Sequence, residues 1–596
     1  MSERQQSSLS RRPNRRLRPV IALGLVAFLV GVFVGGAHSS SSTDENLAER
    51  FAHAWTRHDY STLYSLIGPA AHKAISATSF SELYSQAEAT ATATTLRVLG
   101  RAKMGPGDTV TVPVAVHTRL FGVLHSSFRL PVAGSGSEAR IAWSRSLEFP
   151  GLNPGQLLHR RTELPPRATL LARDGSVLAS GAADSSGPRQ VPLGSAGSAI
   201  VGTIGPPPPE RLKELEDQGV PANAEVGLSG LELAFDTRLR GTPGGELLAG
   251  ERVLARSSAR AAPGIRSTIS PSLQQTAVAA LGSQYGGIVA MKPSGEVLAV
   301  AGIGLDSLQP PGSTFKMVTI TGVLEAGIAH STSTFPYATY TTLDGVKLSN
   351  ANGESCGGSL ALAFAVSCNS VFAPLGVKLG AERLVATAEH FGFNHSPGIP
   401  GAAQSSIPPA SEIQGELDLG STAIGQGQVS ASALQMATVA ATIGQGGRRP
   451  QPTFTPLSHS IHSQALGVRA TSASVARTVR RLMIDVVREG TGTAAAIAGV
   501  IVAGKTGTAE LGSPTCASKA EPESQGQSSE SGSEGEEGCS GSTSNPQDTD
   551  AWFAAFAPAI HPRIVVGVLL VKDGAGGATA APVAREVLLA ALQSHL

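Results

Sequence analysis

The stretch that decides the fold is Pro310-Pro-Gly-Ser-Thr-Phe-Lys316, in the middle of a chain of 596 residues. Pro-Pro-Gly predicts the start of a helix. Ser313 would then lie where free backbone N–H groups and the helix dipole favour negative charge. Lys316 follows three residues later, on the same helix face. A lysine whose pKa is lowered by burial or by neighbouring cations can take the proton of such a hydroxyl. Ser-x-x-Lys alone is weak, because it arises by chance on many helices.

A second motif, Ser367-Cys-Asn369, follows in a region of mixed helix and loop. Its serine hydroxyl could pass a proton, and its asparagine amide could bind a peptide group. Taken alone, the motif indicates no more than an ordinary helix cap.

A third motif, Lys505-Thr-Gly-Thr-Ala509, follows a β-branched run at 500–502, which predicts an exposed strand. Gly507 would let a substrate backbone approach closely. Lys505, Thr506 and Thr508 could hold a carboxylate. This motif is moderately specific by itself, and the three motifs together, in this order and context, are strong.

The sequence around the motifs predicts strands at both ends of one domain and helices between them. Two strands, 287–291 and 297–301, should form a hairpin through Pro293-Ser-Gly. A helix-rich block follows at 311–445. The remaining expected elements are strands at 500–502, 552–556 and 564–571 and an amphipathic helix at 582–596.

The N-terminus combines a basic cluster with an apolar run. The run, 19–38, is long enough to span a bilayer. Arginines precede it at positions 4, 11, 12, 15, 16 and 18, which indicates a cytoplasmic tail over 1–18. A cleaved signal peptide is the alternative. Both an anchor and a signal peptide would place the rest of the chain outside the cytoplasm. If the run is a single-pass anchor, the protein is also held at the cell membrane. The net charge of +1 gives no basic face for nucleic acid.

Two further regions separate this run from the motif-bearing domain. Residues 43–150 begin with helical spacing and continue with strand-like runs, which predicts a small α+β domain. Residues 153–268 lack a clear period and are rich in turns, which suggests an extended, β-rich linker domain.

The chain has four cysteines, at 356, 368, 516 and 539. Disulfides are permitted outside the cytoplasm, and closeness in sequence favours 356–368 and 516–539 among three possible pairings. His459 and His462 are interpreted as solvated loop residues rather than a metal site. We expect neither a metal nor a cofactor.

One segment, 517–548, is rich in Ser, Gly and Glu and nearly devoid of apolar residues. Such a composition predicts a disordered insertion. Its acidic run at 534–537 is most simply a solvated tip.

The three motifs together resemble those of penicillin-binding proteins and class A β-lactamases. Nearly the whole chain resembles class B penicillin-binding proteins, which are D,D-transpeptidases. Residues 43–150 are similar to the NTF2-like N-terminal domain of MecA-type transpeptidases. The stretches 149–152, 167–175, 227–232 and 241–244 resemble landmarks of the dimerisation domain that we assign to 153–268. The implied transpeptidase domain, 270–596, is α/β with a central antiparallel sheet.

The resemblance also implies roles. Ser313 would be the acylated nucleophile, Lys316 its base and Ser367 a proton relay. Asn369 would bind the donor peptide, and Lys505, Thr506, Gly507 and Thr508 the substrate's terminal carboxylate. The backbone N–H groups of Ser313 and Thr508 would form an oxyanion hole.

The implied substrates are peptidoglycan stem peptides or their lipid-linked precursor, with β-lactams as covalent ligands and other cell-wall synthesis proteins as partners. A D,D-carboxypeptidase, a β-lactamase, a β-lactam sensor and a non-catalytic cell-wall scaffold remain alternatives. Cys368 stands where other members of the superfamily carry Asp, which bears little on activity.

Overall fold

The computed structural model describes residues 31–181, 189–457, 467–510 and 549–594. The chain divides into two compact units, each described here by itself. The first comprises residues up to 162 with 214–220 and 244–258, and the second contains the remainder. The expected tail at 1–18, most of the apolar run, the two histidines, the 516–539 pair and the acidic insertion lie outside the described residues.

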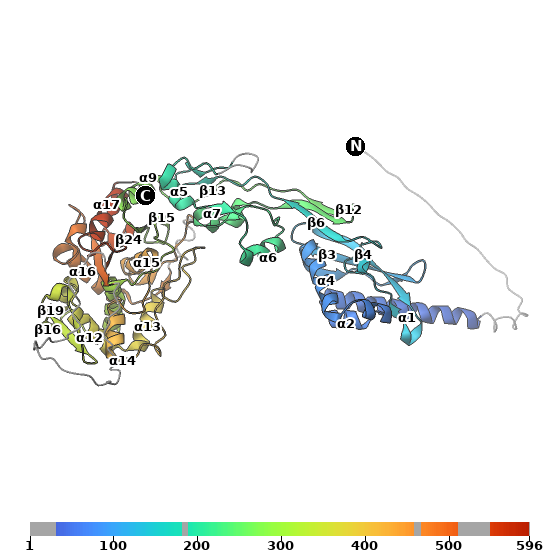
Figure 1. Ribbon diagram of the computed structural model, residues 1–596, viewed down its shortest axis with the longest axis horizontal. Helices are drawn as coiled ribbons and strands as arrows, with labels where there is room; N and C mark the ends of the chain where they lie inside the picture. Colours follow the sequence, from blue (N-terminus) through green and yellow to red (C-terminus); the bar gives the residue numbers. More distant parts are fainter. Residues whose placement is uncertain (1–30, 182–188, 458–466, 511–548, 595–596) are drawn as a thin grey trace, which may run out of the picture. The chain divides into compact units, whose positions relative to one another are not determined.

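The first unit is a helical layer on an antiparallel sheet (Figure 1). The helices are α1 (Gly31–Thr56), α2 (Tyr60–Ser65), α3 (Pro69–Ala74) and α4 (Ala77–Ala91). The strands are β1 (Ala93–Val98), β2 (Lys103–Met104), β3 (Thr109–Thr118), β4 (Gly122–Ala133) and β5 (Arg140–Ile141). Trp55 of α1 meets Phe128 of β4 edge to face, with ring centroids 4.8 Å apart. The expected helical spacing and strands are therefore confirmed. Within the described ranges, no helix is long and apolar enough to cross a membrane.

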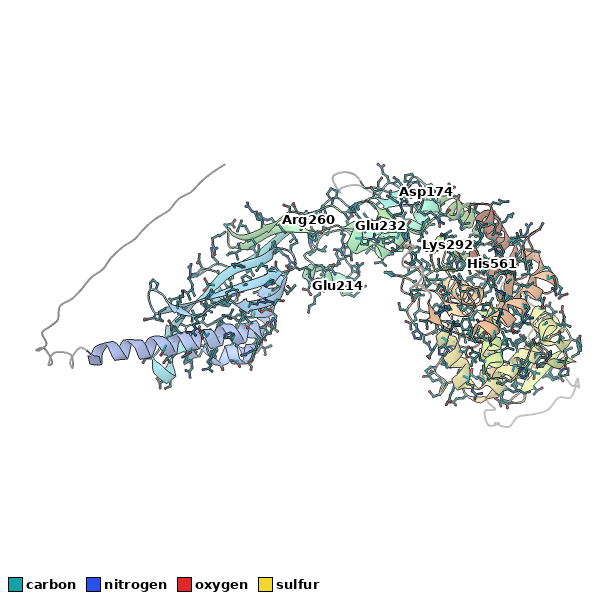
Figure 2. All side chains as sticks on the ribbon, turned by 180° about the vertical axis from the view of Figure 1, so that it is seen from behind. Asp174, Glu214, Glu232, Arg260, Lys292 and His561 are labelled. Atoms are coloured by element: carbon teal, nitrogen blue, oxygen red, sulfur yellow. A yellow bond between two sulfur atoms is a disulfide. The ribbon has the colours of Figure 1, made fainter. Side chains whose placement is uncertain are left out.

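Pieces of the segment 153–268 belong to both units. The sheet β12-β11-β6 lies almost wholly in the first unit and is formed by β6 (Leu158–Glu163), β11 (Gly244–Ala249) and β12 (Arg252–Ser257). In the second unit, Glu232 of α7 (Gly230–Ala234) is fully buried; Figure 2 labels it. It is neutralised by Arg167 at 2.6 Å and Arg189 at 2.8 Å. A buried carboxylate needs such partners because its desolvation is costly.

The second unit is built on a five-stranded antiparallel sheet in the order β15-β14-β24-β23-β22. Its strands are β14 (Gly286–Met291), β15 (Val297–Gly302), β22 (Ala503–Glu510), β23 (Thr549–Ala557) and β24 (Ile564–Leu570). The expected hairpin and central antiparallel sheet are thus confirmed.

Helices cover both faces of this sheet. One face packs on α17 (Ala580–Gln593) and α9 (Pro271–Leu281), and the other on α15 (Ala433–Gly444) (Figure 1). Alternate residues of a strand enter opposite cores: Ile288 packs with the α17 side, whereas Val289 packs with the α15 side. Because both faces are buried, the strands read as continuous apolar runs rather than as alternating ones.

The prediction of an exposed strand at 500–502 was wrong. The strand begins at Ala503, and its residues are buried as far as Gly507. The register of β22 on β23 ends at Ala503 opposite Phe556. Within the described ranges, residues 500–502 therefore have no partner strand beyond an isolated bridge from Val500 to Ile497. β-branched residues favour a strand only where a neighbouring strand can pair with them.

Candidate active site

The first motif lies on a single turn of 3-10 helix, η3 (Gly312–Phe315), which leads into α10 (Lys316–Glu325). The sequence predicted one continuous helix start, and the structure inserts this tighter turn before it. Gly312 has φ of +51°, and a Cβ there would lie 2.5 Å from the Thr508 carbonyl oxygen. The turn is therefore held closely against β22. Ser313 is half-buried, and its hydroxyl has no hydrogen-bond partner among the described residues.

Lys316 is fully buried, and its ammonium nitrogen lies within the second motif. Nζ donates to the Ser367 carbonyl oxygen at 2.7 Å and to Asn369 Oδ1 at 2.7 Å. The Ser367 Oγ lies 3.3 Å away. Burial, assisted by the charge of Lys505, lowers the pKa of Lys316 well below its usual value. The amine is thus prepared to act as a base at neutral pH.

The second motif lies where α11 (Leu360–Ala365) gives way to α12 (Asn369–Leu379). Ser367 adopts φ of +63°, which is uncommon for a residue with a side chain. Strained backbone of this kind gathers at functional sites. The neighbouring Cys368 forms a disulfide with Cys356 of β19 (Cys356–Ser359), so the expected 356–368 pairing is confirmed.

The third motif brings a second buried lysine to the same hydroxyl. Lys505 Nζ donates to Ser367 Oγ at 2.9 Å and to the Thr506 carbonyl at 3.1 Å. Burial lowers the pKa of Lys505 to about 7. Two amines therefore converge on Ser367, and their mutual repulsion opposes protonation of both at once.

Gly507 is required by the protein's own packing. A Cβ at this position would lie 2.8 Å from the Pro311 carbonyl oxygen and 2.9 Å from the Trp552 Cβ. The sequence assigned this glycine to the approach of a substrate backbone. The structure shows in addition that it lets η3 lie against β22, and the approach of a substrate stays a prediction.

Thr508, which is half-buried, faces the η3 side of β22. Its carbonyl oxygen lies beside Gly312, as the close approach above shows. The N–H and C=O of one residue point to the same edge of an antiparallel strand. The Thr508 N–H therefore also points away from β23, towards the turn that carries Ser313. This is the direction required of an oxyanion-hole donor.

Sequence reasoning missed the residues that support the motifs. Thr491 Oγ1 lies 2.5 Å from Thr506 Oγ1 and donates to the Ala365 carbonyl at 3.3 Å, which ties the third motif to the end of α11. Phe372 and Phe364 lie beneath the two amines, each with its ring centroid 5.5 Å from Lys316 Nζ or Lys505 Nζ, respectively. Neither threonine nor phenylalanine stands out in a sequence. The flanking Gly490 and Gly492 were the only signal of close packing near Thr491.

Three features are typical of serine acyltransferases of the penicillin-recognising class: a serine one helical turn before an amine of lowered pKa, a second serine that contacts two amines, and a strand edge whose N–H points towards the first serine. Comparison with known families agrees. Residues 286–589 match the penicillin binding protein transpeptidase domain, 182–253 the penicillin-binding protein dimerisation domain, and 43–156 the NTF2-like N-terminal transpeptidase domain. The chain belongs to the penicillin-binding protein transpeptidase family.

Individual proteins similar to this chain are also named as transpeptidases or penicillin-binding proteins. The chain is 32% identical over 437 residues to the peptidoglycan D,D-transpeptidase PbpA of Mycolicibacterium smegmatis, with 61% of this chain and 80% of that protein covered. It is 36% identical over 311 residues to the protein of that name from Mycobacterium tuberculosis, covering 48% and 55%. The penicillin G acyl-enzyme complex of penicillin-binding protein A from M. tuberculosis has a TM-score of 0.54 at 26% identity, covering 72% of this chain and all of that one. The chain is therefore a serine-type transpeptidase of this family.

Proposed function

We propose that this protein cross-links peptidoglycan by D-Ala-D-Ala transpeptidation through an ester on Ser313. The observation that carries the proposal is the environment of Lys316. Its buried amine, with a lowered pKa, lies one helical turn after Ser313 and contacts both Ser367 and Asn369. The relatives named above support the substrate, since their names state peptidoglycan D,D-transpeptidation.

The hydrogen bonds around Ser367 give the proton a route. A neutral Lys316 has two N–H groups, and the carbonyl of Ser367 and Oδ1 of Asn369 accept one each at 2.7 Å. Its lone pair is then left for a hydroxyl. That lone pair can accept the Ser313 proton. Once protonated, Lys316 can donate to Ser367 Oγ, which lies 3.3 Å from its Nζ and also accepts from Lys505 at 2.9 Å, so Ser367 can pass the proton on.

The reaction then balances in two halves. Lys316 takes the proton of Ser313 as Oγ attacks the carbonyl carbon of the penultimate D-alanine. The backbone N–H groups of Ser313 and Thr508 stabilise the oxyanion. Collapse breaks the peptide bond, and the leaving D-alanine nitrogen receives the proton through Ser367. An acceptor amine attacks the ester, gives up a proton and releases Ser313 with its hydroxyl restored. The terminal carboxylate is held by Lys505 and the threonine hydroxyls of the third motif.

Product analysis tests transpeptidation against hydrolysis. A donor peptide ending in D-Ala-D-Ala is incubated with the full-length protein, with and without an acceptor amine, and the products are identified by mass spectrometry. We expect the acceptor to be joined to the donor with loss of one D-alanine. Release of D-alanine with a hydrolysed donor, even at high acceptor concentration, would indicate a D,D-carboxypeptidase instead. A Ser313→Ala variant, which lacks the nucleophile, is the matched control and should give neither product.

We also propose that residues 19–38 anchor the protein in the cell membrane with its transpeptidase domain outside. The support is sequence-based: an uncharged run preceded by a cluster of arginines. In intact cells, an added protease should cleave the transpeptidase domain and leave a cytoplasmic control protein intact. Recovery of an undigested full-length chain under these conditions would contradict the assigned orientation.

A further inference from the structure

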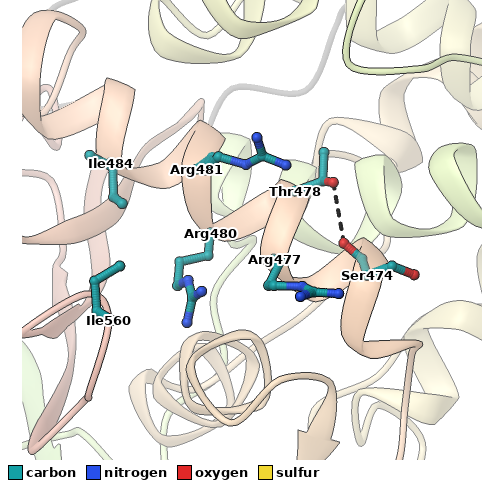
Figure 3. Close-up of a pocket in the computed structure, with 7 residues that line it drawn as sticks. All are labelled: Ser474, Arg477, Thr478, Arg480, Arg481, Ile484 and Ile560. Carbon is teal, nitrogen blue, oxygen red and sulfur yellow. Dashed lines mark hydrogen bonds between the residues drawn. The ribbon is translucent and has the colours of Figure 1, made fainter.

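A basic groove lies along α16 (Ala473–Glu489), on a part of the second unit that the proposed reaction does not use. Its volume is about 370 Å³. Three arginines from one helix, Arg477, Arg480 and Arg481, line it together with Ile484 and Ile560 (Figure 3). We infer that this groove binds an acidic peptide segment of another protein, one that also carries a large apolar side chain.

The groove carries more positive charge than is balanced within the part of the chain that the structure describes. None of the three arginines makes an ion pair or side-chain hydrogen bond there, although Arg481 has a charge interaction with Asp485. The acidic residues on the same helix, Asp485 and Glu489, are both engaged by Arg488, at 2.8 and 2.6 Å. The positive charge of the groove is therefore available to a partner. Planar guanidinium groups can grip carboxylates with two parallel hydrogen bonds.

The order of charges on α16 does not favour the helix itself. Arg477 lies three residues before Arg480 and four before Arg481, so like charges share one face and repel. Arg481 precedes Asp485, which is the less favourable order for such a pair. The helix is stabilised from its other face, where Val479, Leu482 and Met483 are buried. Charged residues that destabilise the helix on which they lie indicate a role other than folding.

The apolar part of the groove selects among anionic partners. Ile560, in the connection between β23 and β24, is 51% exposed, and Ile501 is 54% exposed. The two residues are held near each other, because the Ala559 N–H donates to the Ile501 carbonyl at 2.8 Å. Ile484 completes the apolar side of the groove (Figure 3). A polyphosphate could use only the arginines, whereas an acidic peptide with a leucine or phenylalanine would also cover these isoleucines.

Binding of defined peptides to the purified full-length protein tests this inference. The first probe is a fluorescein-labelled dodecapeptide of alternating Glu and Leu, and the second replaces every Leu with Ser. Fluorescence anisotropy at several salt concentrations gives the Kd of each. We expect the Glu/Leu peptide to bind at least tenfold more tightly than the Glu/Ser peptide. Equal affinities, or equal competition by inorganic polyphosphate, would overturn the inference and leave a non-specific anionic surface.

Two matched variants locate the binding. The triple change Arg477→Gln, Arg480→Gln and Arg481→Gln should weaken Glu/Leu peptide binding at least tenfold. A control changes Lys213, Lys378 and Arg383 to Gln; it removes the same charge from exposed positions elsewhere in this unit and should alter Kd less than twofold. Equal losses in the two triple variants would reject the groove as the site.

Further controls separate this inference from the proposed function. Penicillin labelling of Ser313 is measured in every sample, because α16 also packs on β22. Labelling should be unchanged in both triple variants. If the first triple variant loses labelling, the single change Ile560→Ser replaces it. That change should weaken the Glu/Leu peptide and leave the Glu/Ser peptide unaffected, and equal Kd values for the Glu/Leu peptide before and after it would contradict the inference.

Discussion

At the scale of single residues, the chemistry depends on how two buried lysines share one hydroxyl. Ser367 Oγ lies 3.3 Å from Lys316 Nζ and 2.9 Å from Lys505 Nζ. Both amines are removed from water, which favours their neutral forms. Lys316 has its pKa lowered further by the charge of Lys505. This difference supports our proposal that Lys316 is the base and that Lys505 holds the carboxylate.

Replacing Lys316 tests its role as base. Lys316→Met keeps much of the side-chain volume and removes the amine. We expect acylation by a fluorescent penicillin to slow by roughly a hundred- to ten-thousandfold, the usual contribution of a general base. The circular dichroism spectrum should be unchanged. Lys378→Met, at an exposed position of α12, is the matched control and should label normally. Normal labelling of Lys316→Met would exclude the assigned mechanism.

The lowered pKa of Lys505 predicts a pH dependence. The protonated amine attracts the substrate carboxylate, and its pKa is about 7 in the free protein. As pH rises through that value the amine loses its proton, and the attraction is lost. The second-order rate constant of acylation should therefore fall on the alkaline side with a midpoint near 7, far below that of an ordinary lysine at about 10.4. A rate constant that stays flat from pH 6 to pH 9 would contradict this assignment.

At the scale of elements, the site depends on a turn and a strand edge held in contact. η3 carries Ser313, β22 carries Lys505 and Thr508, and the two touch because Gly312 and Gly507 lack side chains. The third element is the junction of α11 and α12, which Thr491 ties to β22 through Thr506 and Ala365. Each motif therefore lies on a different part of the fold, and the three motifs are brought together by tertiary packing.

The disulfide between Cys356 and Cys368 should stabilise the element that carries the second motif. It closes a short loop, with a sequence separation of 12. Loops of this size contribute about 2–4 kcal/mol by restricting the unfolded chain. The double change Cys356→Ser and Cys368→Ser should lower the free energy of unfolding by a comparable amount in urea titrations. Wild-type protein treated with a reductant should match the variant, and an unchanged midpoint in both samples would contradict the prediction.

The sequence predicted the elements better than it predicted their contacts. Apolar runs placed the hairpin of β14 and β15, and the strands β23 and β24, because a doubly buried sheet leaves a clear apolar pattern. The strand at 500–502 was misplaced, because pairing depends on where β23 ends and not on local composition. The roles of Thr491, Phe364 and Phe372 could not be predicted, since each acts through residues distant in sequence. The three motifs supplied the eight candidate site residues, which the fold places on η3, α10, the junction of α11 and α12, α12 itself and β22. Their catalytic and binding roles stay predictions.

At the scale of the whole molecule, one catalytic domain is combined with regions that carry none of the three motifs. The family comparisons assign an NTF2-like domain to 43–156 and a dimerisation domain to 182–253. The structure shows that the segment around the latter contributes to both compact units. In the second unit, the buried carboxylate of Glu232 pairs with Arg167 and Arg189 and so holds this part of the segment in place. These regions contain no motif residue, so we expect them to contribute by positioning the catalytic domain and by binding partners.

The acidic insertion offers a test at this scale. Residues 517–545 contain almost no apolar side chain to bury, so their removal should not reduce the core. A variant lacking them, with Cys516→Ser to avoid an unpaired thiol, should keep the melting temperature and the penicillin labelling of the full chain. Removal of 29 residues from 381–409, which hold buried side chains such as Leu384 and Phe391, is the contrasting control and should abolish folding. A large fall in melting temperature for the first variant would show that the insertion has a structural role.

The central claim is that Ser313 is the acylated nucleophile, and covalent labelling tests it most directly. The purified full-length protein is incubated with a fluorescent penicillin, digested and mapped by mass spectrometry. The account predicts one stable adduct, on the peptide that contains Ser313, and its loss in Ser313→Ala. An adduct on another residue, or unreacted penicillin with no adduct on the wild-type protein, would contradict it.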